Sequence, residues 1–303
     1  MTPSRQSAGR SVIIPAAGLG TRLSPLTLGA AKELLPLGAY PALTASLLEA
    51  QAAKVNEIVV VTSADKPQLA RFFAELRTLG RFIESGVSPS ASGAGLPAIR
   101  LAQLLVGMTV RLVEQPQPLG VLDAVARGLA LTGMPCAVTF PDLIHQPDQT
   151  ALARLFTAHA ACGQAVIGLR RADPKSTAGT TVAITLAPEY ASASAMQRAE
   201  ATGAPLPIWA VGPSSGAPGE IQTTFGQIHT LALDEAIASC CRPRPDVPLA
   251  DSGLIHALHR LARKGLLFGT FIPGEVIDIG SLAGYLDAAG RFLNRRANLR
   301  GLP

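Results

Sequence analysis

Short runs of apolar, largely β-branched residues recur along the chain, and segments with helical spacing lie between them. The runs at 11–15 and 57–62 are apolar on both faces, which is typical of strands buried in a parallel sheet. Residues 41–53 lie between these two runs, with apolar positions spaced as on one face of a helix. This strand–helix–strand alternation predicts an α/β fold, with a parallel sheet, right-handed crossovers and helices on both faces.

The same patterns extend over the rest of the chain. Residues 85–98 are rich in Gly, Ser and Pro and predict a loop, whereas 187–220 fit neither a helical nor a strand period. We expect a disordered tail over 1–10 and a single domain over 11–303 that ends in a helical extension. Further strands are expected at 110–114, 136–140, 165–169, 180–186, 266–272 and 275–279, and further helices at 66–79, 121–131, 149–161, 230–241, 252–264 and 281–297.

Composition narrows the class of protein. The chain has 303 residues, 48% of them hydrophobic, which is enough for a sizeable core. The net charge is only +5 and no basic cluster occurs, so a nucleic-acid partner is not expected. No uninterrupted apolar stretch of about twenty residues is present, and the cysteines lack metal-ligand spacing. We therefore expect a cytoplasmic protein that binds neither nucleic acid nor a membrane.

A glycine-containing segment, Pro15-Ala16-Ala17-Gly18-Leu19-Gly20-Thr21-Arg22, directly follows the first predicted strand. Glycines let backbone N–H groups approach a polyphosphate closely, and an arginine offers phosphate oxygens a forked donor. Lys32 follows ten residues after Arg22 and could bring a compact charge to a phosphoryl group. Both the Walker spacing and the third glycine of the dinucleotide fingerprint are missing. These residues alone therefore indicate either an anion site or a tight structural turn.

Polar residues also follow other predicted strands. Gln115 and Gly120 flank a proline-rich turn after the strand at 110–114, and Pro141-Asp142 comes directly after the strand at 136–140. A carboxylate at the carboxyl end of a parallel strand lies at the edge of the sheet where ligands bind. Taken singly, Asp142 and the later Asp278 are better explained as caps or turn residues.

Taken together, these segments resemble the sugar-1-phosphate nucleotidylyltransferases. The motif PAAGLGTR, with Pro25 and Thr27 after it and KELLPL at 32–37, is most similar to the bacterial UTP–glucose-1-phosphate uridylyltransferases. The resemblance implies a Rossmann-like mixed, mainly parallel sheet of the nucleotide-diphospho-sugar transferase type. It also implies Mg²⁺-dependent transfer of a uridylyl group from UTP, or a related transfer from dTTP, to a sugar 1-phosphate such as glucose 1-phosphate. Many members are oligomeric, so a homo-oligomer is expected.

The resemblance also implies a role for each matched residue. Arg22 would stabilise the departing pyrophosphate, and Lys32 would contact the reacting phosphate. Asp142 and Asp278 would together hold Mg²⁺, as two hard carboxylates combined with substrate phosphates commonly do. Gly179 would stand in the sugar-binding segment. The expected nucleotide-binding residues are Ala16, Ala17, Gly18, Gly20, Thr21, Gln115 and Gly120.

The chain departs from the family pattern in its middle third. The family carries Glu-Lys-Pro there, for the sugar and its phosphate, whereas this chain has Val211-Gly212-Pro213 and no lysine between Lys175 and Lys264. Leu122-Asp123 also stands where a small residue and His or Gln are commoner. An alternative interpretation is therefore a nucleotide-binding relative that is non-catalytic or uses a different acceptor.

Overall fold

The computed structural model describes residues 9–86, 94–133, 135–146, 151–170, 181–213, 221–224, 230–233 and 252–294. The strands of its large sheet are β1 (Arg10–Pro15), β4 (Val55–Thr62), β5 (Thr109–Glu114), β6 (Cys136–Thr139), β8 (Ala165–Leu169), β9 (Thr181–Leu186), β10 (Leu206–Pro213), β11 (Ile221–Thr224), β12 (Thr230–Leu233) and β13 (Leu267–Phe271). Two small hairpins add β2 (Pro36–Leu37) with β3 (Tyr40–Pro41), and β7 (Leu143–Gln146) with β14 (Glu275–Asp278). The α-helices are α1 (Thr44–Ala52), α2 (Pro67–Glu84), α3 (Leu96–Leu105), α4 (Val121–Leu129), α5 (Ala151–Cys162), α6 (Ala193–Thr202), α8 (Ser252–Arg263) and α9 (Leu282–Asn294).

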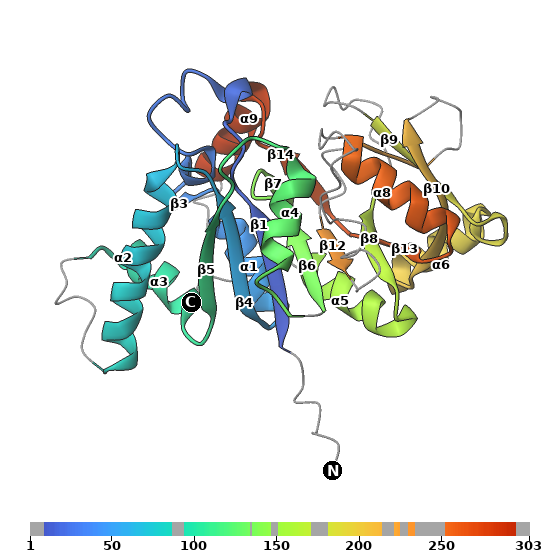
Figure 1. Ribbon diagram of the computed structural model, residues 1–303, viewed down its shortest axis with the longest axis horizontal. Helices are drawn as coiled ribbons and strands as arrows, with labels where there is room; N and C mark the ends of the chain where they lie inside the picture. Colours follow the sequence, from blue (N-terminus) through green and yellow to red (C-terminus); the bar gives the residue numbers. More distant parts are fainter. Residues whose placement is uncertain are drawn as a thin grey trace, which may run out of the picture.

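Helices cover both faces of the sheet, as the strand–helix alternation predicts (Figure 1). Along β1, Val12 and Ile14 face one side and pack with residues of α1, α2, α3, α5 and α9. Ile13 faces the other side, with residues of α4, α6 and α8. All three side chains are fully buried, because a strand in the middle of the sheet is covered on both faces. The predicted α/β fold class is confirmed.

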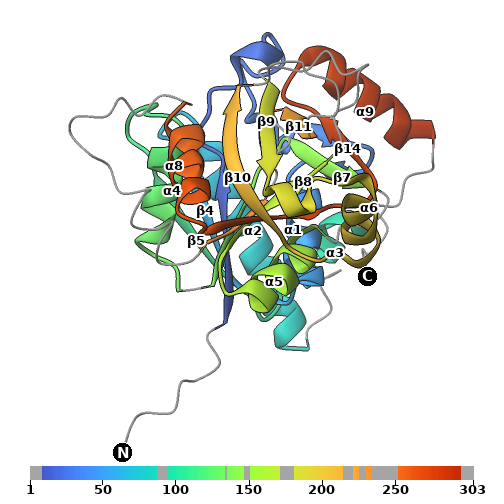
Figure 2. The ribbon, with the colours of Figure 1, turned by 90° about the vertical axis from the view of Figure 1, so that its right-hand side faces the viewer.

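Strand direction places the functional residues at one edge of the sheet. β5, β4, β1 and β6 are parallel neighbours, and β12 pairs antiparallel with both β6 and β8. β8 is therefore parallel to β6, and the carboxyl ends of these strands share one edge. Beyond β8, the next strand, β13, runs parallel to β8. The strands that follow, β10, β9 and β11, each pair antiparallel with the strand before them. Helix α8 packs against β10 (Figure 2).

Several element predictions are wrong. Residues 230–233 form a strand instead of the start of a helix, because the partners β6 and β8 on both sides outweigh the local spacing of so short a segment. The rest of the predicted helix lies outside the described residues. The loop predicted over 85–98 ends early, since α3 begins at Leu96, with Pro97 in the first turn, where proline fits a helix. No pattern predicted β7, β10 or α6.

The described residues begin just before β1 and end with α9, so most of the predicted tail and the final nine residues lie outside them. Residues 87–93 and 171–180, the latter containing Gly179, also lie outside. None of the helices in the described part of the chain combines the length and the hydrophobicity that a bilayer crossing requires.

Candidate active site

The loop after β1 is shaped by its glycines. Ala16 and Ala17 are buried, whereas Gly18 is exposed, and a Cβ added there would meet nothing within 4 Å. Gly20 has a φ of 69°, a left-handed conformation that favours glycine, and the Thr27 hydroxyl donates to its carbonyl at 3.0 Å. Thr21 and Arg22 then begin a short 3₁₀ turn and are exposed. The loop thus presents open backbone at Gly18 and a guanidinium at Arg22.

A buried ion pair between Lys66 and Glu33 is hydrogen-bonded to the start of this loop. Both carboxylate oxygens of Glu33 accept hydrogen bonds from Lys66 Nζ, at 2.8 and 2.9 Å, and the same ammonium donates to the Ala16 carbonyl at 2.7 Å. The three donors of Lys66 are therefore all used within the protein. Glu33 is next to Lys32, so Lys66 connects the start of the loop, the Lys32 turn and the end of β4.

The sequence did not predict this pair. Two charged residues far apart in a chain usually lie on the surface, yet the Glu33 side chain is fully buried and that of Lys66 is only 6% exposed. The available signal was the position of Lys66, a few residues after the carboxyl end of a parallel strand, where ligand-binding residues concentrate.

The hairpin of β7 and β14 brings two distant aspartates together. Asp142 directly precedes β7, and Asp278 is the last residue of β14, opposite Leu143. The Ile279 N–H donates to the Asp142 carbonyl at 2.8 Å, which extends the pairing beyond the hairpin. The structure therefore brings together the two carboxylates that the resemblance pairs as metal ligands.

Four charged side chains converge on the space beside Gly280. A Cβ on Gly280 would lie 2.9 Å from Asp278 Oδ1, 3.2 Å from Arg22 Nη2 and 3.2 Å from Asp142 Oδ2. Lys32 Nζ donates to that same Asp142 oxygen at 2.6 Å. Glycine leaves this space open, so two cationic and two anionic groups from four separate segments share it.

Burial and mutual attraction set the charges of these groups. Burial by itself would lower the pKa of Lys32, but the Asp142 and Glu33 carboxylates outweigh it and raise that pKa. Burial would likewise raise the pKa of Asp142, yet the Lys32 ammonium holds it below its usual value. For Asp278, burial and the neighbouring Asp142 raise the pKa. A cation placed between the two carboxylates would relieve this repulsion.

The donor set fits a magnesium ion. Asp142 Oδ2 and Asp278 Oδ1 are hard oxygen donors that border the same open space, the one a Cβ of Gly280 would fill. In the part of the chain that the structure describes, no group of three or more His, Cys, Asp or Glu side chains is placed to hold a metal. One or two carboxylates completed by waters and substrate phosphates is the arrangement that Mg²⁺ commonly takes.

Gln115 and Gly120 close the turn between β5 and α4. Gln115 is 5% exposed, and its Nε2 donates to the Gly120 carbonyl at 3.0 Å and to Asp123 Oδ2 at 2.8 Å. Gly120 has a φ of 86° and a ψ of 179°, an extended conformation with positive φ that favours glycine. Gln115 and Gly120, both predicted to bind the nucleotide, are therefore in contact, and a buried side chain closes the proline-rich turn.

The segment that the resemblance assigns to the acceptor, Val211-Gly212, offers no charged side chain. Val211 is 2% exposed, and both its N–H and its carbonyl lie within hydrogen-bond distance of His259 Nδ1, at 3.4 and 2.7 Å. Gly212 offers no side chain, and a Cβ added there would meet nothing within 4 Å. Gly179, the predicted sugar-binding residue, lies outside the described residues.

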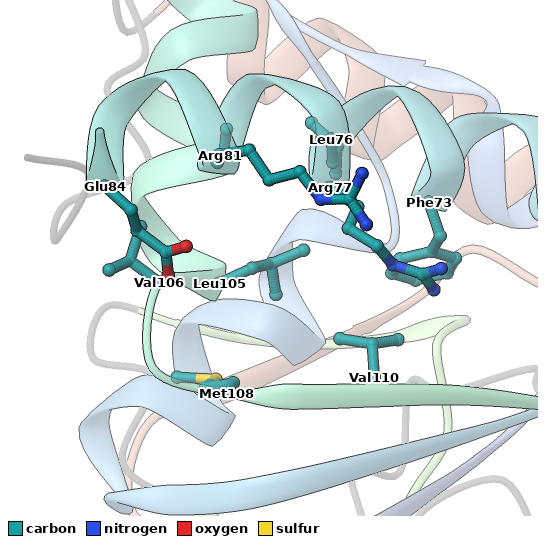
Figure 3. A pocket seen from close by; sticks show the side chains of 11 residues that line it. Phe73, Leu76, Arg77, Arg81, Glu84, Leu105, Val106, Met108 and Val110 are labelled. Atoms are coloured by element: carbon teal, nitrogen blue, oxygen red, sulfur yellow. The ribbon is translucent and has the colours of Figure 1, made fainter. Parts of the chain in front are cut away.

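A cavity of about 160 Å³ lies elsewhere, between α2, α3 and the start of β5. Phe73, Arg77 and Arg81 line it from α2, opposite Met108 and Val110 (Figure 3). These last two residues are at the amino end of β5, whereas Gln115 follows its carboxyl end. The cavity is therefore at the opposite edge of the sheet and contributes none of the candidate residues.

A model of one family of known proteins matches residues 11–183, more than half of the chain, and its description is nucleotidyl transferase. The chain belongs to the nucleotidyl transferase family. The matched residues of this nucleotidyl transferase include the loop after β1, Lys32, Gln115 and Asp142. The β10 segment with Val211 and the Asp278 hairpin strand lie beyond them.

One curated relative of this nucleotidyl transferase is described as a putative UTP–glucose-1-phosphate uridylyltransferase of Bacillus subtilis (strain 168). The two are 31% identical over 163 residues, which cover 53% of this chain and 57% of that one. The chain thus spans about half the length of this relative.

Solved structures extend the similarity over nearly the whole fold. The UTP-bound UGPase from Acinetobacter baumannii is 20% identical, with a TM-score of 0.71 over 96% of this chain and 95% of that one. A UDP-glucose pyrophosphorylase complexed with UDP-glucose is 19% identical, with a TM-score of 0.70 over 95% of this chain and 99% of the other. At identities this low, the similarity to these two structures is evidence for a shared fold only.

Proposed function

We propose that this nucleotidyl transferase moves a uridylyl group from UTP to a sugar 1-phosphate, giving a UDP-sugar and pyrophosphate. The observation that carries the proposal is the meeting of Arg22, Lys32, Asp142 and Asp278 around the open space at Gly280. This is the charge pattern that in-line phosphoryl chemistry requires, with cations for the phosphate oxygens and carboxylates for a divalent metal.

In the proposed reaction, an oxygen of the sugar phosphate attacks the α-phosphorus of UTP. A new oxygen–phosphorus bond forms as the bond to the bridging α–β oxygen breaks, and the electron pair leaves with pyrophosphate. Lys32 neutralises the reacting phosphate and Arg22 the leaving group, while the backbone of Gly18 and Gly20 approaches the triphosphate. When bound by Asp142 and Asp278, Mg²⁺ would supply further neutralisation of the phosphate oxygens.

UTP and glucose 1-phosphate are the substrates we propose, with dTTP as the other nucleotide to test. The uridylyltransferase names of the curated relative and the UTP-bound structural neighbour support this choice. The PAAGLGTR motif and Pro141-Asp142 at the end of β6 also favour the uridylyl branch.

The proposal is tested by pyrophosphate release from UTP or dTTP with several sugar 1-phosphates, in the presence and absence of Mg²⁺. We expect release with UTP and glucose 1-phosphate that depends on the metal. Nucleotide binding without release from any pair of substrates would contradict the proposal. Light scattering on the same sample checks the prediction of a homo-oligomer.

A second candidate is a nucleotide-binding relative that is non-catalytic or uses a different acceptor. The buried Val211 and the bare Gly212 favour it, because they replace the carboxylate and the ammonium that the resemblance assigns to the sugar phosphate. Such a protein would still bind the triphosphate. In the substrate panel, it would release pyrophosphate either with none of the acceptors or only with one other than glucose 1-phosphate.

A further inference from the structure

In the side-chain amide of Gln115, the nitrogen Nε2 is hydrogen-bonded within the protein. Both of its N–H groups are used, one by the Gly120 carbonyl at 3.0 Å and the other by Asp123 Oδ2 at 2.8 Å. Nothing in the described part of the chain donates a hydrogen bond to Gln115 Oε1. Since Gln115 is almost fully buried, the orientation of its amide decides which hydrogen bonds it can offer a ligand.

Asp123 allows only one orientation of this amide. Rotating the amide by 180° would place Oε1 against a carboxylate and a carbonyl, both of which are acceptors. Asp123 is 3% exposed, and its Oδ2 accepts hydrogen bonds from both Gln115 Nε2 and Arg127 Nε, the latter at 2.7 Å. Charge-assisted hydrogen bonds are the stronger kind, so the carboxylate holds Gln115 with its carbonyl oxygen unused.

An amide fixed in this way can accept a hydrogen bond but cannot donate one. Uracil and thymine carry a donor at N3, whereas N3 of cytosine carries a lone pair. A cytosine placed against Gln115 Oε1 would bring two acceptors together and leave both unpaired, which a buried site rejects strongly.

We propose that Asp123 is a positioning residue that makes Gln115 selective for the N3–H of uracil or thymine over cytosine. The inference rests on the proposed function and on the resemblance, which counts Gln115 among the nucleotide-binding residues. It goes further by assigning the choice of base to a residue where the chain departs from the family pattern. It does not separate UTP from dTTP, because both carry the same N3–H.

The test compares UTP with CTP in wild type, Asp123→Asn and Arg127→Gln. Asparagine has the shape of aspartate but can donate as well as accept, so it no longer enforces one amide orientation. We expect the UTP-to-CTP ratio of kcat/KM to fall by about tenfold in Asp123→Asn, the size expected for one charge-assisted hydrogen bond. Arg127→Gln removes the ion pair but keeps both bonds of Gln115, so its ratio should stay within about twofold of wild type.

Calorimetric affinities for UTP and CTP are measured on the same variants, so that binding is tested separately from transfer. If wild type binds UTP but transfers it to no sugar, the proposed function fails and the affinity ratios decide the inference. If wild type transfers from UTP and CTP equally well, the inference fails while nucleotidyl transfer stands. An unchanged ratio in Asp123→Asn, or an equal fall in Arg127→Gln, would also overturn it.

Discussion

The proposed triphosphate side and the proposed acceptor side of this site are built in opposite ways. On the first, Arg22, Lys32, Asp142 and Asp278 come from four segments and meet at one open space. On the second, the Val211 side chain is buried in the apolar packing and its backbone contacts His259, while the neighbouring Gly212 has no side chain.

Because the two sides use different parts of the fold, the residues for the two halves of the proposed reaction can diverge separately. The charged groups proposed to act on UTP come from the two 3₁₀ turns that contain Arg22 and Lys32 and from the β7–β14 hairpin region, whereas the proposed acceptor segment lies on the antiparallel strand β10. A missing charge-assisted contact to the sugar phosphate costs about 1.5–3 kcal/mol, or one to two decades of affinity. We therefore expect strong use of the triphosphate and weak binding of the acceptor.

The largest expected effect comes from removing a charge on the triphosphate side. Asp142→Asn keeps the shape of the side chain but removes the negative charge that faces Lys32 and the metal space. Turnover should fall by about 10³-fold, because the metal and the cations would lose their common partner. The measurement is pyrophosphate release at saturating Mg²⁺.

Asp287→Asn is the matched control, since Asp287 is half exposed on α9 and pairs only with Arg291 among the described residues. It should keep the wild-type rate. A rate for Asp142→Asn within about threefold of wild type would remove Asp142 from the site.

The second effect concerns the buried Glu33–Lys66 ion pair beside the loop after β1. Lys66→Met leaves the Glu33 carboxylate buried without its partner, and the free energy of unfolding should fall by about 3–5 kcal/mol. Replacing both residues, Glu33→Leu with Lys66→Met, should restore most of it, because a buried ion pair can be exchanged for apolar packing. Urea unfolding measures both changes. Lys264→Met, at an exposed lysine, serves as the control, and an equal loss there would refute a special role for the pair.

Filling the space beside Gly280 gives the third effect. In Gly280→Ala the new Cβ would lie 2.9 Å from Asp278 Oδ1, so the carboxylate must shift. A shift of this kind should lower turnover by about 10²-fold and raise the Mg²⁺ concentration needed for half-maximal rate. Gly290→Ala, where a Cβ meets nothing within 4 Å, should leave both quantities unchanged. A Mg²⁺ requirement that is the same in Gly280→Ala and wild type would contradict the placement of the metal.

The smallest effect should come from adding a charge on the acceptor side. Gly212→Lys has open space for its side chain and brings an ammonium to the segment that lacks one. The KM for glucose 1-phosphate should fall by about tenfold, while the KM for UTP stays the same. Gly212→Met supplies equal length without charge and should change neither. If the lysine and methionine variants behave alike, the acceptor phosphate is not bound beside residue 212.

The sequence predicted some strands and site residues correctly and others wrongly. The strands β1, β4 and β6 were predictable because central parallel strands are continuous apolar runs. Asp142 was found because it follows such a strand, and Lys32 because of its spacing from the glycine-containing loop after β1. β12 was predicted as a helix, since its two neighbouring strands lie far away in the sequence and local spacing does not reveal them.

The sequence indicated which residues belong to the site better than it indicated the contacts between them. Nothing in the local pattern shows that Lys66 reaches Ala16 and Glu33, because these contacts depend on how three loops meet. Asp123 was noticed only as a departure from the family pattern, and the structure showed that it holds Gln115. Burial of single charges is decided by tertiary packing, which a single sequence does not display.

The two Michaelis constants of the wild-type protein test the comparison most directly. Initial rates of pyrophosphate release, with UTP and glucose 1-phosphate varied in turn at saturating Mg²⁺, give both values. We predict a KM for UTP in the usual range of about 1 μM–1 mM and a KM for glucose 1-phosphate at least tenfold higher. A KM for glucose 1-phosphate equal to or below that for UTP would contradict the account, because the acceptor would then be held as firmly as the triphosphate.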